Sequence, residues 1–221
     1  MRPGRTSVVA WASLALFCVC ACASSPEGST AAKRKEARRR TVILTSKDDV
    51  RVGREGAEQV AAEIGTFDDP ELEAYVAGIG KKLIRALPSR SFAYSFKIVD
   101  QMEPNAFALP GGHIFVSRGL LALANSEDEL ACVLGHEIIH AARRHSARRQ
   151  AAARSIPGLT LPRTRAQTLA AYGRDMEREA DRVGFGVMTD AGFESRGVSG
   201  MFERLQQAAR LNAKWAKTRS V

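Results

Sequence analysis

Hydrophobic positions recur at helical spacing over most of the chain beyond residue 47. The segment from about Asp48 to Ile64 is typical of a polar helix, and Asp69-Pro70 is typical of an N-cap followed by proline at the first helical position. Apolar residues then recur every three or four positions as far as Leu87, which predicts a second helix. The same spacing predicts further helices at about 127–153, 166–191 (ending at Gly192) and 199–212.

The hydrophobic period changes from about 3.6 to 2 after Pro88, which ends the second helix. Apolar residues alternate with polar or small ones from Phe92 to Ile98, as in a half-buried strand. Two short extended runs at 105–109 and 113–117 flank Pro110–Gly112, and this tripeptide suits a turn between strands. The pattern therefore predicts an α+β fold that is mainly helical and contains a small β-sheet.

The helix predicted from residue 127 carries the clearest chemical motif, His136-Glu137-Ile138-Ile139-His140, which is HExxH. Residues i and i+4 project from the same helical face, so His136 and His140 can share one zinc ion. Glu137 is rotated by about 100 degrees from His136 and can take a proton from metal-activated water as general base. With four histidines in 221 residues, only ~0.005 chance matches are expected, so coincidence is a poor explanation. Ser126 and Glu129 open this helix with the spacing of a capping box.

Two carboxylates in the following predicted helix, Glu177 and Asp181, are again four residues apart. One of them can bind zinc while the other holds a ligand histidine. Glu177 is the candidate third ligand, because a His-His-Glu set leaves the fourth position to water, as in catalytic rather than structural zinc sites. Glu179 is the main rival, but it points about 200 degrees away from Glu177 on the same helix.

The two remaining histidines are weaker candidates. His145 follows His136 by nine residues, off the metal face and within a basic cluster, so a surface or packing role is expected. His113 lies in a predicted strand, from which it could face a substrate.

Several short motifs between about Gly53 and Leu211 form a set that is far more specific than HExxH alone. These landmarks are Asp69-Pro70, Tyr75-Val76 with Ile79-Gly80, Asn105 to Gly112 (NAFALPGG), Val116 to Leu121, Leu134 to His140 (LGHEIIH), Arg144-His145-Ser146, Glu177 to Asp181 and Ala191-Gly192-Phe193. On these landmarks the chain resembles the zinc metallopeptidases of the HtpX and CaaX prenyl protease family, especially its periplasmic LoiP/BepA-like branch.

The resemblance implies a compact, mainly helical HExxH metallopeptidase (gluzincin-like) domain with a small β-sheet. One zinc ion, Zn(2+), is expected per chain, bound by His136, His140 and Glu177. Glu137 is then the general base, and Asp181 supports the site from behind the ligands.

The resemblance also implies how substrate binds. The strand near Gly111 to Val116 is expected to be a sheet edge that receives extended substrate by backbone pairing, a mode that favours unfolded polypeptide. The expected substrate-binding residues are Asn105, Gly111, Gly112, His113, Ile114 and Phe115.

The N-terminal segment is typical of an export signal, because two arginines precede an apolar run from Val8 to Val19. At about 12 residues this run is shorter than the roughly 20 that a membrane-spanning helix needs. Residues 1–23 are therefore predicted to be a signal peptide, cleaved before Cys22 or after Ala23. Cleavage before Cys22 is favoured, in a bacterial lipobox that makes Cys22 the lipidated residue, and Ala23 then resembles an outer-membrane sorting signal.

Charge and cysteine content refine this picture. The net charge of +9 is partly local, since Lys33 to Arg40 (KRKEARRR) holds six basic residues and one acidic one. Residues 24–46 are predicted to be a basic flexible linker near a membrane surface, and nucleic-acid binding is not expected. The metallopeptidase domain is predicted at 47–213 and a C-terminal tail at 214–221.

Only one of the four cysteines, Cys132, lies outside the N-terminal segment, so a disulfide framework is excluded. Cys132 is expected to be a small buried hydrophobe.

The sequence thus predicts a zinc-dependent endopeptidase that hydrolyses peptide bonds in misfolded or misassembled cell-envelope proteins. It is expected to face the periplasm, attached to the outer membrane as a lipoprotein. The alternative is a zinc-binding, chaperone-like or gated low-activity module of the same fold. This alternative is kept because the chain ends at Val221, before the His-Pro loop with which the family usually continues.

Overall fold

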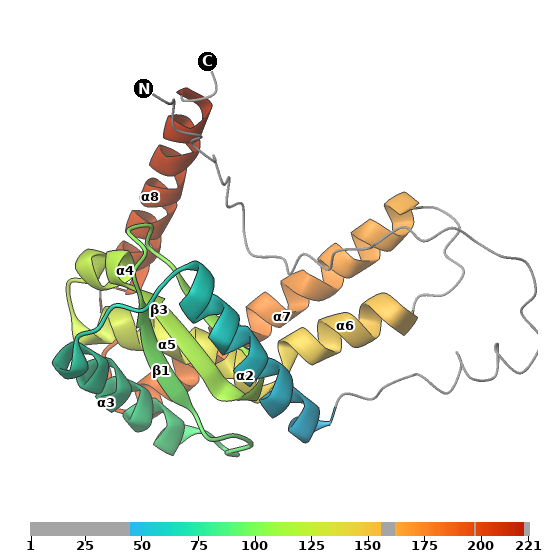
Figure 1. Cartoon of the computed structure of the whole chain (residues 1–221), viewed down its shortest axis with the longest axis horizontal. Helices are drawn as coiled ribbons and strands as arrows, with labels where there is room; N and C mark the ends of the chain where they lie inside the picture. Colours follow the sequence, from blue (N-terminus) through green and yellow to red (C-terminus); the bar gives the residue numbers. More distant parts are fainter. Residues whose placement is uncertain (1–44, 156–161, 197, 219–221) are drawn as a thin grey trace, which may run out of the picture. The chain divides into compact units, whose positions relative to one another are not determined.

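The computed structural model describes residues 45–155, 162–196 and 198–218. The predicted signal peptide, the lipidation site Cys22 and nearly all of the basic linker lie outside the described residues. The described part is an α+β fold, mainly helical with a small three-stranded sheet, as predicted (Figure 1). Its elements are α2 (Ser46–Glu63), α3 (Pro70–Ala86), β1 (Ser95–Val99), β2 (Ala106–Leu109), η1 (Pro110–Gly112), β3 (His113–Ser117), α4 (Arg118–Leu123), α5 (Glu127–Ala142), α6 (His145–Ser155), α7 (Pro162–Asp190) and α8 (Val198–Thr218).

The sheet has the strand order β1-β3-β2, with β3 parallel to β1 and antiparallel to β2. The predicted turn Pro110–Gly112 joins β2 to β3, and Gly111 in it has a φ of 80°, which favours glycine. The prediction that the strand near Gly111 to Val116 is a sheet edge is wrong. This strand, β3, is central and pairs on both sides, because the chain returns after β1 to place β3 beside it. Among the described strands, β1 and β2 are the edges.

Capping residues set the helix ends where the sequence predicts them. The Asp69 side chain accepts a hydrogen bond from the Leu72 backbone N–H at 3.0 Å, and Pro70 occupies the first position of α3. At the end of α7, Gly192 has a φ of 88° and the Phe193 N–H donates to the Met188 carbonyl at 3.2 Å.

The capping box predicted at the start of α5 is only half formed. The Ser126 hydroxyl accepts from the Glu129 N–H at 3.3 Å, as expected. The Glu129 carboxylate instead accepts from the Asn125 N–H at 2.7 Å and from the Arg204 guanidinium of α8. This carboxylate is buried and thus joins the start of α5 to α8.

The helix predicted at 127–153 is two helices. α5 ends at Ala142 and α6 begins at His145, because Arg144 between them adopts a left-handed conformation with a φ of 55°. Such a φ is costly for a residue other than glycine and interrupts a right-handed helix. The Arg144 guanidinium pairs with Asp49, a buried carboxylate of α2, and this pair holds the turn in place.

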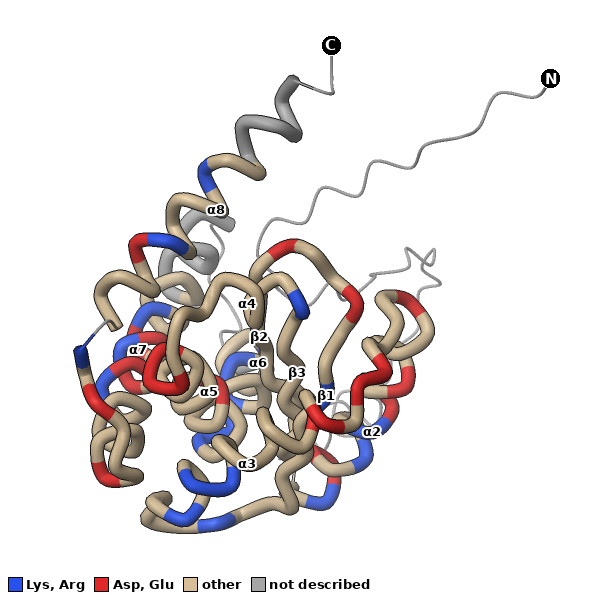
Figure 2. Tube along the Cα trace, turned by 90° about the vertical axis from the view of Figure 1, so that its left-hand side faces the viewer, with Lys and Arg blue, Asp and Glu red and all other residues tan. Residues whose placement is uncertain are grey.

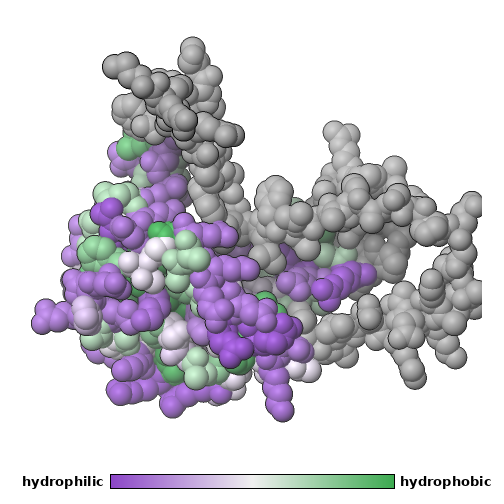
Figure 3. Space-filling model, in the orientation of Figure 1, coloured by the Kyte–Doolittle hydropathy of each residue, from purple (hydrophilic) through white to green (hydrophobic). Residues whose placement is uncertain are grey.

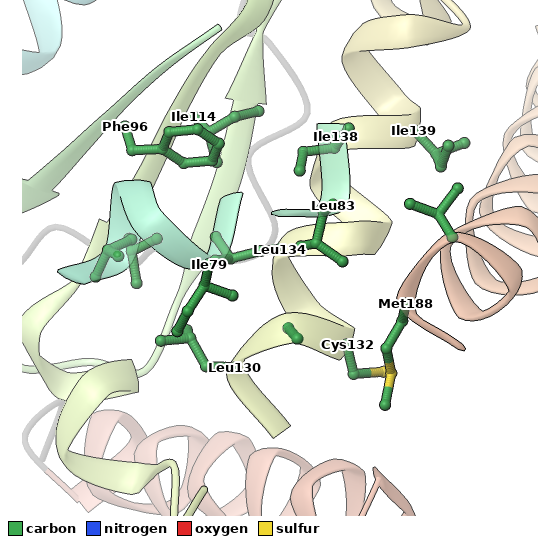
Figure 4. Close-up of a cluster of buried hydrophobic side chains, with 14 of the residues drawn as sticks. Ile79, Leu83, Phe96, Ile114, Leu130, Cys132, Leu134, Ile138, Ile139 and Met188 are labelled. Atoms are coloured by element: carbon green, nitrogen blue, oxygen red, sulfur yellow. The ribbon is translucent and has the colours of Figure 1, made fainter. Parts of the chain in front are cut away.

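The hydrophobic core surrounds α5 (Figure 4). Leu134 and Ile138 of α5 lie near Leu83 of α3, and Ile114 of the sheet belongs to the same buried cluster. Met188 of α7 belongs to the cluster as well, close to Cys132 in this view. Helix α5 is therefore packed between other elements, and its sequence is apolar apart from the first turn and the polar residues of HExxH.

α5 and α7 cross with their backbones in close contact. A Cβ atom on Gly184 would lie 2.9 Å from the Gly135 carbonyl carbon and 2.9 Å from the His136 amide nitrogen. The two glycines therefore allow the short distance between α5 and α7 at their crossing, which lies directly beside the first residue of HExxH.

Charged residues of both signs lie along the helix surfaces (Figure 2). The face shown in Figure 3 is mainly hydrophilic, with small hydrophobic areas between the polar ones. Within the described ranges, none of the helices combines the length and apolarity that a membrane span requires.

Candidate metal centre

Three predicted ligands from two helices come together at the crossing of α5 and α7. His136 and His140 lie one turn apart on α5, with their Nε2 atoms 3.0 Å from each other. Glu177 of α7 directs Oε2 to within 3.5 Å of the His136 Nε2 and 3.6 Å of the His140 Nε2. These atoms lie within 4.8 Å of one another, so the three residues form a group that could hold a metal ion.

The donor set suits a transition metal such as zinc, because two imidazole nitrogens and one carboxylate oxygen leave further coordination positions open. The site is also accessible, since the side chain of Glu177 is 50% exposed while those of His136 and His140 are 22% and 16% exposed. Interaction with the two neighbouring imidazoles holds the pKa of the Glu177 carboxyl far below its ordinary value.

Asp181 lies behind His136, one helical turn beyond Glu177. Its Oδ1 is 2.8 Å from the His136 Nδ1. A carboxylate accepts hydrogen bonds only, so the His136 Nδ1 carries the proton and donates it to Asp181. The His136 Nε2 lone pair is then directed at the site where the other two ligand atoms lie.

Glu137 lies beside the three ligands and on the side of β2. It is half-buried, and the backbone N–H of Ala108 donates to its carboxylate. Burial raises the pKa of Glu137, and the charge of Glu177 adds to this rise, although both neighbouring histidines and the Ala108 amide act in the opposite direction. A carboxylate with a raised pKa in this position is suited to accept and release a proton.

His145 is outside the group of ligand candidates and is buried, so of the two roles expected for it, it has the packing role rather than the surface role, and it also contacts the centre. It is 1% exposed, and its Nδ1 lies 3.1 Å from the Nδ1 of His140. On its other side the Nε2 of His145 lies 3.3 Å from Oε2 of Glu179. Burial is the main cause that lowers the pKa of His145 to about 4, and the charge of the neighbouring His140 is the second.

Helical phase could not place His145, because the left-handed residue Arg144 resets the phase immediately before it. The landmark Arg144-His145-Ser146 was the only sequence signal that pointed to this position. Glu179, the rival for the ligand role, faces His145 and lies outside the group of three metal-ligand candidates.

The predicted substrate-binding residues do not line this centre in the way expected. Ile114 and Phe115 are buried within β3, and Gly111 packs against the backbone of α2, where a Cβ would lie 2.8 Å from Val50 Cα. His113 is half-buried and its Nδ1 lies 2.9 Å from the Ser95 Oγ. Gly112 is buried as well, and Asn105 precedes β2 and joins its backbone to Ser117. Gly111, Gly112, Ile114 and Phe115 therefore pack within the fold, and a substrate-binding role for Asn105 and His113 stays a prediction.

A partly open groove of about 570 Å³ adjoins the centre on the side of Asp181. It is lined by Cys132, His136, Arg178, Asp181, Arg182, Phe185, Val198 and Phe202. Cys132 is 8% exposed and its pKa is raised to about 11, first by burial and then by Asp181, so it is the buried, unreactive thiol that the sequence predicts.

Comparison with known proteins agrees with this geometry. Residues 70–166 match the sequence model of Peptidase family M48. This segment contains α3, the sheet and all of α5, and so includes His136, Glu137 and His140. This part of the chain is therefore similar to the peptidases of family M48.

Curated proteins similar to the chain include one mitochondrial and two bacterial peptidases. The chain is 28% identical over 188 residues to the mitochondrial metalloendopeptidase OMA1 of Schizosaccharomyces pombe, a match that covers 77% of this chain and 56% of the relative. It is 30% identical over 172 residues to the putative beta-barrel assembly-enhancing protease of Vibrio cholerae, covering 67% and 36%. The Escherichia coli beta-barrel assembly-enhancing protease is 26% identical over 196 residues, covering 77% and 40%.

The chain spans about a third to just over half of the length of these relatives. The family match ends at residue 166, before Glu177 and Asp181. The placement of these two carboxylates beside the histidines is an observation of the structure itself, made independently of the match.

Proposed function

We propose that this protein is a zinc-dependent endopeptidase that hydrolyses peptide bonds in misfolded or misassembled proteins of the cell envelope. His136, His140 and Glu177 hold the zinc ion, and Glu137 is the general base. The observation that carries the proposal is the convergence of two Nε2 atoms and one carboxylate oxygen within 4.8 Å, with Glu137 beside them.

The orientation of His136 supports the metal site. Its Nδ1 donates to Asp181, so its Nε2 presents a lone pair to the His140 Nε2 only 3.0 Å away and to the ionised Glu177. These three atoms form a donor set that a bound cation would complete. The same set of two histidines and one glutamate, with positions left for water and substrate, is the arrangement of catalytic zinc sites.

Zinc bound here would polarise a peptide carbonyl and lower the pKa of a water molecule. Glu137 accepts the proton of the attacking water on its carboxylate and then transfers it to the amine of the departing peptide. The Ala108 N–H holds the Glu137 carboxylate in this orientation. Asp181 keeps the His136 Nδ1 protonated throughout.

Extended polypeptide is the proposed substrate, bound along β2 rather than β3. β2 is an edge strand, and its residue Ala108 contacts the general base Glu137 directly. A segment that adds to this edge through backbone hydrogen bonds brings its own carbonyl groups towards the centre. Binding through the backbone selects unfolded segments and imposes little sequence preference.

An envelope location is proposed from the relatives and from the N-terminal sequence. Two bacterial relatives are named beta-barrel assembly-enhancing proteases. The lipobox-like sequence ending at Cys22 and the basic residues from Lys33 to Arg40 suit a lipid-anchored protein that faces the periplasm. Substrates and the outer membrane are thus the proposed partners.

The test is casein cleavage by the purified, metal-loaded protein and by Glu137→Gln. The variant keeps all three ligands but cannot accept a proton, so we expect unchanged zinc content and cleavage reduced by at least about a hundredfold. Removal of zinc with a chelator should abolish cleavage by the unmodified protein, and added zinc should restore it.

Equal cleavage by Glu137→Gln and the unmodified protein would contradict the role of Glu137. One zinc ion per chain without any cleavage would favour a chaperone-like or gated module. A protein that binds no zinc would contradict the metal centre.

A further inference from the structure

A chain of polar contacts leads from the predicted ligand His140 through His145 to Glu179. The Nδ1 atoms of His140 and His145 are 3.1 Å apart, and the two rings meet edge to face with 4.8 Å between their centroids. The Nε2 of His145 lies 3.3 Å from Oε2 of Glu179. His145 is almost completely enclosed, at 1% exposure, so water does not substitute for either partner.

Glu179 fixes the position of the proton on His145. Its Oε2 accepts from the Arg148 guanidinium at 2.9 Å, and its Oε1 lies 3.4 Å from Nε of Arg143. Two arginines keep this carboxylate ionised, and an ionised carboxylate can only accept hydrogen bonds. The His145 Nε2 must therefore carry a proton and donate it to Glu179.

The state of His145 in turn fixes the proton on His140. The two Nδ1 atoms are 3.1 Å apart, so one must donate and the other accept, and an imidazole whose single proton is on Nε2 has an accepting Nδ1. The Nδ1 of His140 faces this acceptor and must donate to it. The lone pair of His140 is then on Nε2, the atom that faces His136 and Glu177.

We propose that His145 and Glu179, held by Arg148, are positioning residues that lock the ligand His140 in its Nδ1–H tautomer. The inference rests on the proposed metal centre, because it concerns how one of its ligands is oriented. Asp181 holds the non-ligating nitrogen of His136 in its protonated form by direct contact. Glu179 does the same for His140 indirectly, through His145.

The break between α5 and α6 is what makes this relay possible. In one continuous helix, His145 would point away from His140, since five residues advance the helix by about 500 degrees. The left-handed φ of 55° at Arg144, stabilised by its ion pair with Asp49, turns the chain so that His145 lies against His140. An unusual backbone conformation is thus used to place one side chain.

The first test uses the metal-free protein without any substitution. Long-range proton–nitrogen correlation spectra of histidine labelled with nitrogen-15 report which ring nitrogen carries the proton. We expect the Nδ1–H form for His140 and the Nε2–H form for His145. Finding His140 in the Nε2–H form, or His145 protonated on Nδ1, would overturn the proposal.

The second test measures zinc affinity by competition with a chromophoric chelator. His145→Leu fills the same space but offers no acceptor, and we expect its affinity to fall about 10- to 100-fold. His145→Asn restores an acceptor oxygen near the position of Nδ1 and should recover most of this loss. Equal affinities for the Leu variant and the unmodified protein would contradict a positioning role.

Glu179→Gln and a matched control complete the design. The introduced amide can donate as well as accept, so it releases the constraint on His145, and the spectrum of metal-free Glu179→Gln should show His140 shifting towards the Nε2–H form. Asp175→Asn removes an exposed ion pair with Arg178 from the same helix and should leave the tautomer and zinc affinity unchanged. A Glu179→Gln spectrum identical to that of the control would refute the relay.

These measurements remain informative if the proposed peptidase activity fails. The tautomers are read in the absence of metal and substrate, and zinc affinity is read without turnover. A protein that binds zinc through His140 but cleaves nothing would leave the relay intact, whereas wrong tautomers in an active peptidase would remove the relay alone.

Discussion

A single proton on each ligand histidine decides whether this centre can bind metal. For His136 the proton is held on Nδ1 by Asp181 at 2.8 Å. The side chain of Asp181 is 59% exposed, so water can partly replace it, and the bond to His136 is worth less than a fully buried one. The two ligand histidines are therefore supported unequally, His136 by an exposed carboxylate and His140 through a buried ring.

Asp181→Ala should weaken zinc binding by about tenfold, the lower end of the effect of residues that support metal ligands. The loss is limited because water can accept the His136 Nδ1 proton once the carboxylate is gone. Competition with a chelator measures the change, and Asp175→Asn provides the control on the same helix. A loss as large as that of removing His136 itself would mean that Asp181 is a ligand.

At this scale, the residues of the centre that share a helical face could be predicted from the sequence. HExxH places two histidines on one face by spacing alone, and Glu177 and Asp181 share a phase on the next helix. The contact of His145 with His140 was not predicted, because Arg144 between them leaves the helical region of φ and ψ. The spacing of hydrophobic residues does not reveal a single residue in the left-handed conformation.

At the scale of elements, the crossing of α5 and α7 sets the distance between the histidines and Glu177. Gly184→Ala would bring a methyl group to within 2.9 Å of the backbone of α5, and α7 would have to move away. We expect the free energy of unfolding to fall by about 1–3 kcal/mol and zinc affinity to fall with it, because Glu177 moves with α7. Urea denaturation and chelator competition measure the two effects.

Gly186→Ala is the matched control for this prediction. Gly186 lies two residues further along α7, and a Cβ atom there meets nothing within 4 Å. Replacing glycine with alanine in an open helical position should stabilise the protein by about 0.5–1 kcal/mol. If both variants behaved alike, the close contact of the two backbones would not be what fixes the crossing.

The order of the strands also could not be predicted from local pattern. Alternation identified β1, β2 and β3, and Pro110–Gly112 identified the turn between the last two. Which strand is central depends on where β1 packs, and β1 joins β3 in parallel through contacts that are distant in sequence. The strand proposed to bind substrate is therefore the edge strand β2, and not β3 as the sequence predicted.

At the scale of the whole folded unit, an ion pair between the buried Glu129 and the partly exposed Arg204 joins the start of α5 to α8. Burial alone would raise the pKa of Glu129, but hydrogen bonds from Arg204 and the Asn125 N–H, with the charge of Arg204, hold its pKa below 4.5. A carboxyl group with a depressed pKa stabilises the fold above the pKa of the unfolded chain. This contribution is lost as the pH falls through its folded-state value.

Glu129→Gln should therefore lower the free energy of unfolding at pH 7 by about 1–2 kcal/mol, because it weakens a charged hydrogen bond whose Arg204 partner is partly exposed to water. The loss should shrink as the pH falls below about 4.5, because Glu129 becomes protonated in the original protein as well. Urea denaturation at several pH values measures both curves. Parallel curves down to pH 3 would exclude Glu129 as a source of the acid sensitivity.

The close contact of Gly135 and Gly184 has a thermodynamic consequence for metal uptake. Helices in backbone contact cannot move closer together, so the three candidate ligands already lie near one another before an ion binds. Loading then orders no segment and buries little new apolar surface, and the heat capacity of the protein should barely change. The metal would bind to a preformed site, so the free energy of binding would not be reduced by the cost of folding the domain.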